Sequence, residues 1–574
     1  YFVSFGYNPN EKHNFNFLIT GAPQWHDQNY SKSISSYLEY GRRYNNNWGT
    51  YQGEYKTERR NFYHKPVMNI NWDYAISDDS NLSTVLYASW GRGGGTGNRG
   101  NRERTNTGYV DYDAIYANNA AAVDGNFGNG AYITRSSMNN HSWYGMVSNY
   151  EKQLNDNLVW NVGADLRTYY GTHFRQVKDL HGLSSWTEDR RLKDATHNRV
   201  GDVVSVTATN AFSANPWATF FNSANENERI DYDSSERISY AGMFTQLEYA
   251  TDKLSAFVQG SLSQQNHQRF DRYDYDANSQ DSEKVSNVGY NVKAGGSIIV
   301  DESNKVYANA GVYSRQPFHD AIFNTYDNRV SPFTQNEDIL GLELGYSYAK
   351  NNFSANVNLY RTSWKNRVVS SSRVVDGVVE NTLNFGAEQL HQGIEIDFRT
   401  KMLNDKLTFK GFTSIGDWEY VGSTVRRVVD EDQVVLSESN NDVDGGKVGD
   451  AAQFTLGFGL DYAITDNLSM DFDWRLYDGL YANVGAVKNN LELPTYDIAD
   501  LGISYRLFIG ENKDKNLDFR LNVNNLFYEV YLTDLRDNDE ASPIASENWK
   551  GINKSNRGMF GWGRTWNASV KYSF

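Results

Sequence analysis

Cysteine is absent from this chain of 574 residues, and proline is scarce, with only eight residues. Without cysteine there can be no disulfide and no thiolate nucleophile or metal ligand, although this absence identifies no cellular compartment. The chain also has no run of 18 consecutive apolar residues, which excludes membrane-spanning helices. Any stable structure must therefore be built from patterns other than disulfides or long apolar segments.

Aromatic residues are abundant, with 40 Tyr, 14 Trp and 29 Phe, yet the mean hydropathy is a hydrophilic −0.68. A soluble chain of this length would ordinarily form three or four domains. Many aromatic residues with low hydropathy suit a membrane β-barrel instead. Only half of each strand then touches lipid, and Tyr and Trp gather where an apolar surface meets water.

The net charge is −16. Binding to nucleic acid depends on Lys and Arg that neutralise phosphates, so this charge argues against a nucleic-acid partner. The chain begins with Tyr1, and no basic and apolar signal sequence precedes it. We therefore expect that the chain starts partway through a longer precursor.

The last eleven residues show the clearest pattern in the sequence. Trp566, Ala568, Val570, Tyr572 and Phe574 alternate with polar residues and therefore share one face of an extended strand. An uncharged face opposite a fully polar face is typical of a strand between hydrocarbon and water. The pattern predicts a lipid-facing strand at the carboxyl terminus.

The same alternation recurs along the chain in nine pairs of segments that are joined by short turns. With the terminal strand they make nineteen predicted strands: 1–7 with 13–20, 66–76 with 82–90, 143–154 with 158–170, 240–250 with 254–268, 288–300 with 305–315, 340–348 with 353–360, 392–402 with 407–420, 454–464 with 468–477, 496–509 with 517–528, and 564–574. Much longer polar segments separate the pairs, including 91–140, 171–239 and 361–391, which we expect to be loops.

This alternation of short and long connections predicts an all-β fold. Specifically, it predicts a transmembrane antiparallel up-and-down β-barrel with short periplasmic turns and long extracellular loops. A soluble sandwich or propeller shows similar strands without this rhythm. The register is firmly specified, because a slip of one residue in 454–464 would turn Asp461 toward lipid.

Several segments carry a resemblance to a known family. "LNVNNLFYEVYL" (521–532), "RTWNASVKYSF" (564–574), "HQGIEIDF" (391–398) and "LGLELGYSYAKNNFSANVNLYRTSWKNR" (340–367) resemble the C-terminal half of TonB-dependent outer-membrane transporters. "NFLITGAPQWHDQ" (16–28) looks like the Bacteroidota type of this family. The resemblance covers most of the chain, and its motifs specify the barrel better than the substrate.

The resemblance implies a 22-stranded barrel filled by an N-terminal plug, and active uptake of a nutrient with energy relayed by TonB. Residues 1–574 would then be a partial barrel, with three strands, the plug and the TonB-contacting segment upstream. It also implies outer-membrane lipids and lipopolysaccharide as partners. The substrate stays open among siderophores, oligosaccharides, peptides and cobalamin, and so does a surface lipoprotein lid of the SusC-like kind.

Two segments contain candidate ligand contacts. Arg92, Arg99 and Arg102 lie in a Gly-rich segment that is predicted to be a flexible loop, where they could bind an anionic ligand or a lipopolysaccharide phosphate. The alternative is a loop that is simply solvated. Trp25 and His26 follow a strand end and offer an aromatic platform beside a hydrogen-bonding group; here the alternative is an interfacial Trp at the barrel rim.

Other chemistry has little support in the sequence. The match to GxGxxG at 95–100 is not followed by a helical pattern, so no cofactor is expected. His13, His64, His141 and His319 lack the spacing of zinc ligands, and we expect isolated surface or girdle residues and no metal site. No catalytic motif is present, and we expect no enzyme. A barrel hydrolase built from Ser371, His391 and Asp397 is one alternative, and a passive pore or envelope-complex subunit is another.

Overall fold

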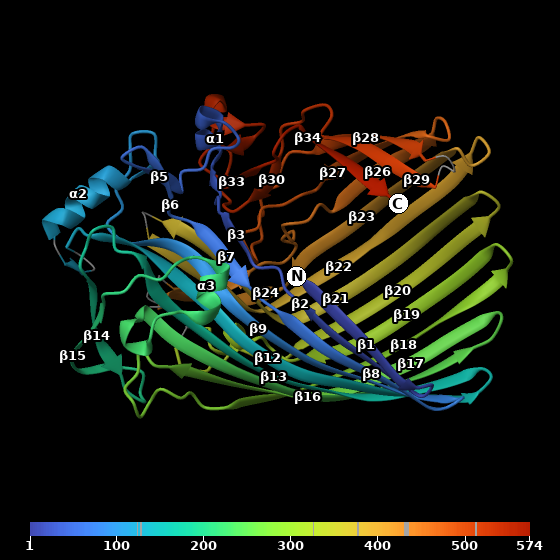
Figure 1. Cartoon of the computed structure of the whole chain (residues 1–574), viewed down its shortest axis with the longest axis horizontal. Helices are drawn as coiled ribbons and strands as arrows, with labels where there is room; N and C mark the ends of the chain where they lie inside the picture. Colours follow the sequence, from blue (N-terminus) through green and yellow to red (C-terminus); the bar gives the residue numbers. More distant parts are fainter. Residues whose placement is uncertain (123, 127–128, 325–326, 376–377, 430–434, 511–513) are drawn as a thin grey trace.

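An antiparallel sheet of 23 strands dominates the protein (Figure 1). The computed structural model describes residues 1–122, 124–126, 129–324, 327–375, 378–429, 435–510 and 514–574. Four strands of the sheet belong to long connections: β3 (Gln24–Asp27), β7 (Arg60–His64), β24 (Ser423–Val429) and β25 (Val435–Asp442). The other nineteen form the wall.

The wall strands pair with one another in chain order. They are β1 (Phe2–Asn10), β2 (His13–Thr20), β8 (Val67–Ser77), β9 (Ser80–Gly100), β12 (Tyr132–Asn155), β13 (Leu158–Asp179), β16 (Ile230–Ala250), β17 (Leu254–Asp271), β18 (Val285–Asp301), β19 (Asn304–Arg315), β20 (Glu337–Lys350), β21 (Phe353–Val375), β22 (Val378–Met402), β23 (Leu407–Val421), β26 (Phe454–Ala463), β27 (Leu468–Asp478), β28 (Tyr496–Ile509), β29 (Lys515–Asn524) and β34 (Thr565–Ser573).

All nineteen predicted strands are confirmed, and so is the rhythm of their connections. Turns such as 11–12 and 156–157 join the strands at one end of the wall, on the right of Figure 1, and the long connections gather at the other end. The edges of the sheet are β1 and β34, and no pairing joins these two strands in the described part of the chain.

The outer face of the wall is apolar. The strand registers place Leu86 opposite Met146 and Met146 opposite Leu166, so these three side chains form a row across β9, β12 and β13. No part of the chain that the structure describes covers this row, since Leu86 and Leu166 remain 47% and 45% exposed. Trp90 and Tyr144 lie further along the same face, toward the long connections, and the Trp90 indole donates a hydrogen bond to the Tyr144 hydroxyl (2.8 Å). Such aromatic girdles flank the lipid-facing band of outer-membrane barrels.

The inner face is polar and charged. Lys410 of β23 lies 3.5 Å from Asp461 of β26 and 3.3 Å from Asp473 of β27. Further around the wall, Arg520 of β29 pairs with Asp471 of β27 at 2.8 Å. The register therefore turns Asp461 inward, as predicted, and charges on this face meet partners instead of hydrocarbon.

Several strands extend well past their predicted ends. The prediction of a flexible loop at 91–104 was wrong for residues 91–100. Residues 91–100 continue β9, which here pairs with β12 on one side and β7 on the other. A Cβ atom on Gly93 would come within 2.2 Å of the Phe62 carbonyl oxygen, and one on Gly94 within 2.1 Å of that of Ser137. The glycines allow close strand approach here. Strands also occupy much of 171–239 and 361–391.

The long connections contain short elements of their own. These are β4 (Lys32–Ser33), α1 (Ile34–Tyr40), β5 (Trp48–Tyr51), β6 (Glu54–Thr57), β10 (Val110–Asp111), α2 (Tyr112–Ala122), β11 (Gly125–Asn126), β14 (Trp186–Lys193), β15 (Arg199–Ala208), α3 (Pro216–Phe221), η1 (Glu226–Glu228), α4 (His319–Ile322), β30 (Leu532–Leu535), η2 (Ala545–Glu547), β31 (Asn548–Trp549), β32 (Ile552–Asn553) and β33 (Arg557–Phe560). Three of the connections share one apolar core, to which Ile34, Leu480, Leu493 and Phe560 contribute. The long-loop end is therefore packed structure.

The two faces of the wall should respond differently to a new charge. Replacing Leu166 by Arg puts a cation on the outer face, where it should lower the free energy of unfolding by roughly 2 to 4 kcal/mol near the middle of the bilayer. Unfolding by urea in phospholipid vesicles measures the change.

The matched control is Gln246→Arg, on the inner face of β16 and next but one to Glu248. It should change the free energy of unfolding by less than about 1 kcal/mol, because a charge there stays in water. Equal effects of the two substitutions would contradict the assignment of the faces.

Candidate functional site

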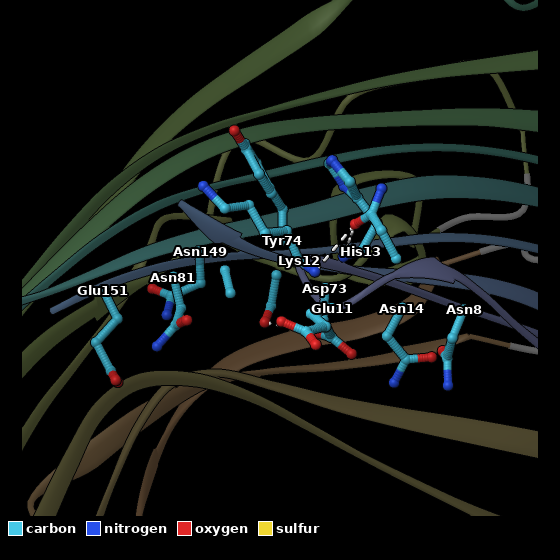
Figure 2. Close-up of a pocket in the computed structure, with 13 residues that line it drawn as sticks. Asn8, Glu11, Lys12, His13, Asn14, Asp73, Tyr74, Asn81, Asn149 and Glu151 are labelled. Carbon is cyan, nitrogen blue, oxygen red and sulfur yellow. Dashed lines mark hydrogen bonds between the residues drawn. The ribbon is translucent and has the colours of Figure 1, made fainter. Parts of the chain in front are cut away.

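A cavity of about 710 Å³ opens on the inner face at the short-turn end of the wall (Figure 2). Three carboxylates line it, those of Glu11, Asp73 and Glu151, together with one ammonium group, that of Lys12, and several Asn side chains. The Asn10 side chain holds the β1–β2 turn by accepting hydrogen bonds from the backbone of Lys12 (3.0 Å) and His13 (3.1 Å). This polar cavity lies at the opposite end from the long connections.

Trp25 and His26 lie in β3, which pairs with β7, and they point to opposite faces. Trp25 is opposite Phe62 on the outer side, 55% exposed, with the Arg60 guanidinium 4.1 Å from its ring centre. His26 is exposed on the inner side, and its Nδ1 lies 3.0 Å from Gln24 Oε1. The structure therefore separates these two predicted contacts.

Arg92 also points to the outer face, where it lies opposite His64 of β7. Its Nη1 donates hydrogen bonds to the carbonyl oxygens of Gly91 (2.7 Å) and His141 (2.6 Å). The guanidinium is thus held against the wall by backbone acceptors.

Arg99 belongs to a network that ties the β14–β15 hairpin to the wall. Its guanidinium lies 2.8 Å from Glu188 and 2.8 Å from Asp231. Glu188 also accepts hydrogen bonds from the Trp186 indole (2.9 Å) and the Tyr273 hydroxyl (3.0 Å). Burial by itself would raise the pKa of Glu188, but Arg99 and these donors outweigh burial and lower it. The carboxylate therefore stays ionised inside packed structure.

Arg102 makes a second buried pair. Its Nε and Nη2 each lie 2.7 Å from an oxygen of Glu58, a residue with no exposed surface. The Tyr132 hydroxyl donates a further hydrogen bond to Glu58 (2.9 Å). The predicted Arg-rich loop is therefore replaced by ordered structure in which Arg99 and Arg102 are held by carboxylates.

Four side chains that the sequence analysis did not group meet on the inner face near the long connections. His173 Nε2 of β13 lies 3.4 Å from one oxygen of Glu236 of β16, and His319 Nε2 of α4 lies 3.4 Å from the other. His319 Nδ1 is 3.4 Å from Nδ1 of His267 on β17. We call these four residues the histidine–glutamate cluster. The expectation that His319 is isolated was wrong.

The cluster forms because α4 folds back onto the wall. His173, Glu236 and His267 share the inner face of three neighbouring strands, and α4 brings His319 onto them from the β19–β20 connection. His319 and Ile322 of α4 are 7% and 1% exposed. The alternation of polar residues predicts the three strand positions, but nothing local in the sequence predicts the return of α4.

The remaining sequence candidates do not assemble. His391 and Asp397 are six residues apart on β22, which separates their Cα atoms by about 20 Å. His391 stacks on Trp418, while Asp397 accepts hydrogen bonds from Asn356. Within the ranges given above, no group of three His, Asp or Glu side chains is arranged to hold a metal ion. No helix in those ranges is long and apolar enough to cross a membrane.

Protonation of His319 should loosen α4. Burial lowers the pKa of His319 to about 4, although the negative charge of Glu236 favours the protonated form. The pKa in an unfolded chain is about 6.5, so between about pH 6.5 and 4 the unfolded form binds a proton that the folded form lacks, which costs up to about 3 kcal/mol at the acidic end. The protection factors of the α4 amides, which correct for the slower intrinsic exchange in acid, should therefore fall as the pH falls through this range.

A His319→Gln variant should lose most of that fall in protection, while His26→Gln, at an exposed position, should show the same fall as the unmodified protein. The groups that face His319 also titrate or carry charge: Glu236, His173, His267, Arg269 and the adjacent Asp320. Burial and the nearby Glu236 raise the pKa of Asp320, and its protonation opposes the loosening. If His319→Gln keeps the full acid response, another of these groups causes it.

The Arg102–Glu58 pair should be structural. Arg102→Ala removes both 2.7 Å guanidinium contacts from a fully buried carboxylate, which among the described residues keeps only Arg59 Nε at 3.4 Å as a cation, and should lower the free energy of unfolding by about 3 kcal/mol. Arg104→Ala is the matched control, because Arg104 is exposed and donates to backbone carbonyl oxygens of Asn46 and Gly108. Its cost should be about 1 kcal/mol. Comparable urea midpoints for the two variants would contradict a buried structural pair.

The comparisons with known proteins agree with this architecture. Solved structures with a similar fold include the unliganded ferric citrate transporter FecA (12% identity, TM-score 0.62, 100% of this chain and 69% of that chain), the copper transporter OprC (11%, 0.64, 100% and 73%) and the siderophore receptor PiuA from Acinetobacter baumannii (12%, 0.60, 99% and 73%). A search of curated protein sequences gave no match. The profile of the TonB dependent receptor-like beta-barrel family matches residues 89–526, so the chain belongs to this family of outer-membrane β-barrel receptors.

Proposed function

We propose that this protein imports a nutrient ligand across the outer membrane with energy relayed by TonB, and that the ligand first binds at the long-loop end of the inner wall. Membership of the TonB-dependent receptor family carries the transport part of the proposal. Ferric citrate, copper and siderophores are named for proteins of similar fold. A siderophore, an oligosaccharide or a peptide remains the proposed range of ligands for this chain.

The inner wall at this end offers suitable chemistry for such a ligand. Within the described residues, the buried Nε2 atoms of His141 and His267 have no hydrogen-bond partner. Ligand sites commonly combine an apolar surround with a few directed polar groups. Imidazole nitrogens and the Glu236 carboxylate on one wall supply both donors and acceptors for a polar ligand.

Of the predicted ligand contacts, His26 is placed best, because it is exposed on the inner side of β3 near the long connections. Trp25 and Arg92 lie on the outer face, where they would meet lipid or lipopolysaccharide more readily than a ligand in the lumen. Arg99 and Arg102 could bind a ligand only by giving up their carboxylate partners. We therefore propose His26 as the first of the five to test.

The proposal includes an N-terminal plug upstream of these residues and TonB as the energy-coupling partner. The plug is supported by the wide, polar inner face of the wall. Its side chains need hydrogen-bond partners, which either water or a domain inside the barrel would supply. A plug-less pore or a barrel subunit of an envelope complex is the alternative, and it requires no energy input. A surface lipoprotein lid and membership of the Bacteroidota type stay predictions.

Energy dependence distinguishes import from passive flow. Cells that express the full-length protein should accumulate one of a panel of radiolabelled siderophores, oligosaccharides or peptides, and deletion of TonB should abolish this accumulation but leave surface binding unchanged. Accumulation that persists without TonB would contradict energised import and favour a pore.

His26→Ala should weaken surface binding of the transported ligand about 5- to 30-fold if one hydrogen bond worth about 1 to 2 kcal/mol is lost. The matched control is His13→Ala, at the short-turn end of the wall, where the His13 ring stacks 4.4 Å from that of Tyr74 on the outer face. Equal affinities of the two variants would remove His26 from the site without affecting the transport proposal.

A further inference from the structure

The β15–β16 connection folds back over the outside of the wall. Phe62, Met138 and Phe174 lie side by side on the outer face of β7, β12 and β13, and they are buried by Ala214 and Ala224 of this connection. Between the two alanines lies α3, which Figure 1 shows in front of the wall beside β7 and β9. A loop segment thus covers the outer face just where the lipid-facing band ends.

Both ends of the connection are fixed to β13. The Phe212 amide donates to the Val177 carbonyl oxygen (2.9 Å), and the Ala224 amide donates to the side chain of Gln176 (2.9 Å). Asn215 caps α3 by accepting from the amides of Trp217 (2.9 Å) and Ala218 (3.1 Å). The orientation of the helix is therefore set by specific hydrogen bonds.

This helix lies next to the aromatic girdle. Trp217 contacts His64, with ring centres 4.6 Å apart, and His64 is opposite Arg92 on β9. Arg92 is only two residues beyond Trp90, so the helix begins about 7 Å further along the strand direction. That distance places α3 at the level of the lipid headgroups, in continuity with the lipid-facing band.

Two large apolar side chains of α3 are largely exposed, although Trp217 also contacts the wall through His64. Phe221 is 82% exposed and Trp217 is 53% exposed. We propose that α3 is an interfacial anchor whose Trp217 and Phe221 side chains insert among the lipids of the outer leaflet. Aromatic side chains on a helix in the plane of the interface bind membranes in this way, with the rings at the boundary of headgroups and acyl chains. The partner is the lipid surface itself.

These 574 residues contain no cysteine, which allows a direct test: with any cysteine elsewhere in the full-length protein replaced by serine, one introduced thiol is unique. A nitroxide is attached to Phe221→Cys, and separately to Trp217→Cys, and the full-length protein is placed in asymmetric vesicles with lipopolysaccharide outside. Power-saturation EPR then compares collisions with oxygen, which concentrates in lipid, and with a water-soluble nickel chelate. Both labels should collide several-fold more with oxygen relative to nickel than a label in the water-exposed β15 at Val203→Cys does.

Leu166→Cys, on the outer face, serves as the lipid reference and shows that the barrel is inserted. If the α3 labels match Val203→Cys while Leu166→Cys matches lipid, α3 faces water and the anchor is refuted. If they are shielded from both reagents, a protein partner or a second copy of the chain covers α3, and the lipid proposal is likewise refuted. Phe221 is highly exposed and its ring contacts only the edge of the neighbouring Phe220 ring among the ring contacts of the described residues, so its replacement should leave the fold intact.

Discussion

The antiparallel backbone ladder is the constraint on which the rest of this structure depends. Inside hydrocarbon no water can bond to a peptide group, so each strand must satisfy its N–H and C=O groups through its neighbours. Once the ladder is formed, side chains alternate strictly between lipid and lumen, and the register decides the environment of every residue. The apolar outer row through Leu86, Met146 and Leu166 and the inward charges of Lys410 and Asp461 are both results of that one rule.

The constraint weakens at the long-loop end, and different interactions take over there. Strands such as β9 and β12 continue beyond the aromatic girdle. Outside the bilayer, water can form hydrogen bonds with the backbone, and side chains no longer need to alternate between apolar and polar. Buried ion pairs and apolar packing hold this region instead. Glu58 with Arg102 and Glu188 with Arg99 join segments far apart in sequence, and both carboxylates are nearly inaccessible to solvent. Charged residues that suggest mobile ligand contacts thus form ion pairs that join separate segments at the long-loop end.

The sequence predicts the wall well because the physics of each strand is local. All nineteen wall strands follow from a period of two within about ten residues. Strand extension past residue 90 could not be predicted, since a Gly-rich run is typical of loops and its role as a close-packed strand depends on β7 and β12. The histidine–glutamate cluster was missed for the same reason. Its members come from β13, β16, β17 and α4, and no spacing along the chain indicates that α4 returns to the wall.

The apolar core shared by three connections also limits how this surface can evolve. Ile34, Leu480 and Phe560 come from separate connections, so a change of size in one of them has to be matched by its two partners. Positions that point away from this core, such as the exposed Val203 on the β14–β15 hairpin, are free of that restriction. Substitutions at such exposed hairpin positions can therefore accumulate one at a time. The interlocked residues would change only together, and because they are buried they keep the packing of this end constant while the exposed positions vary.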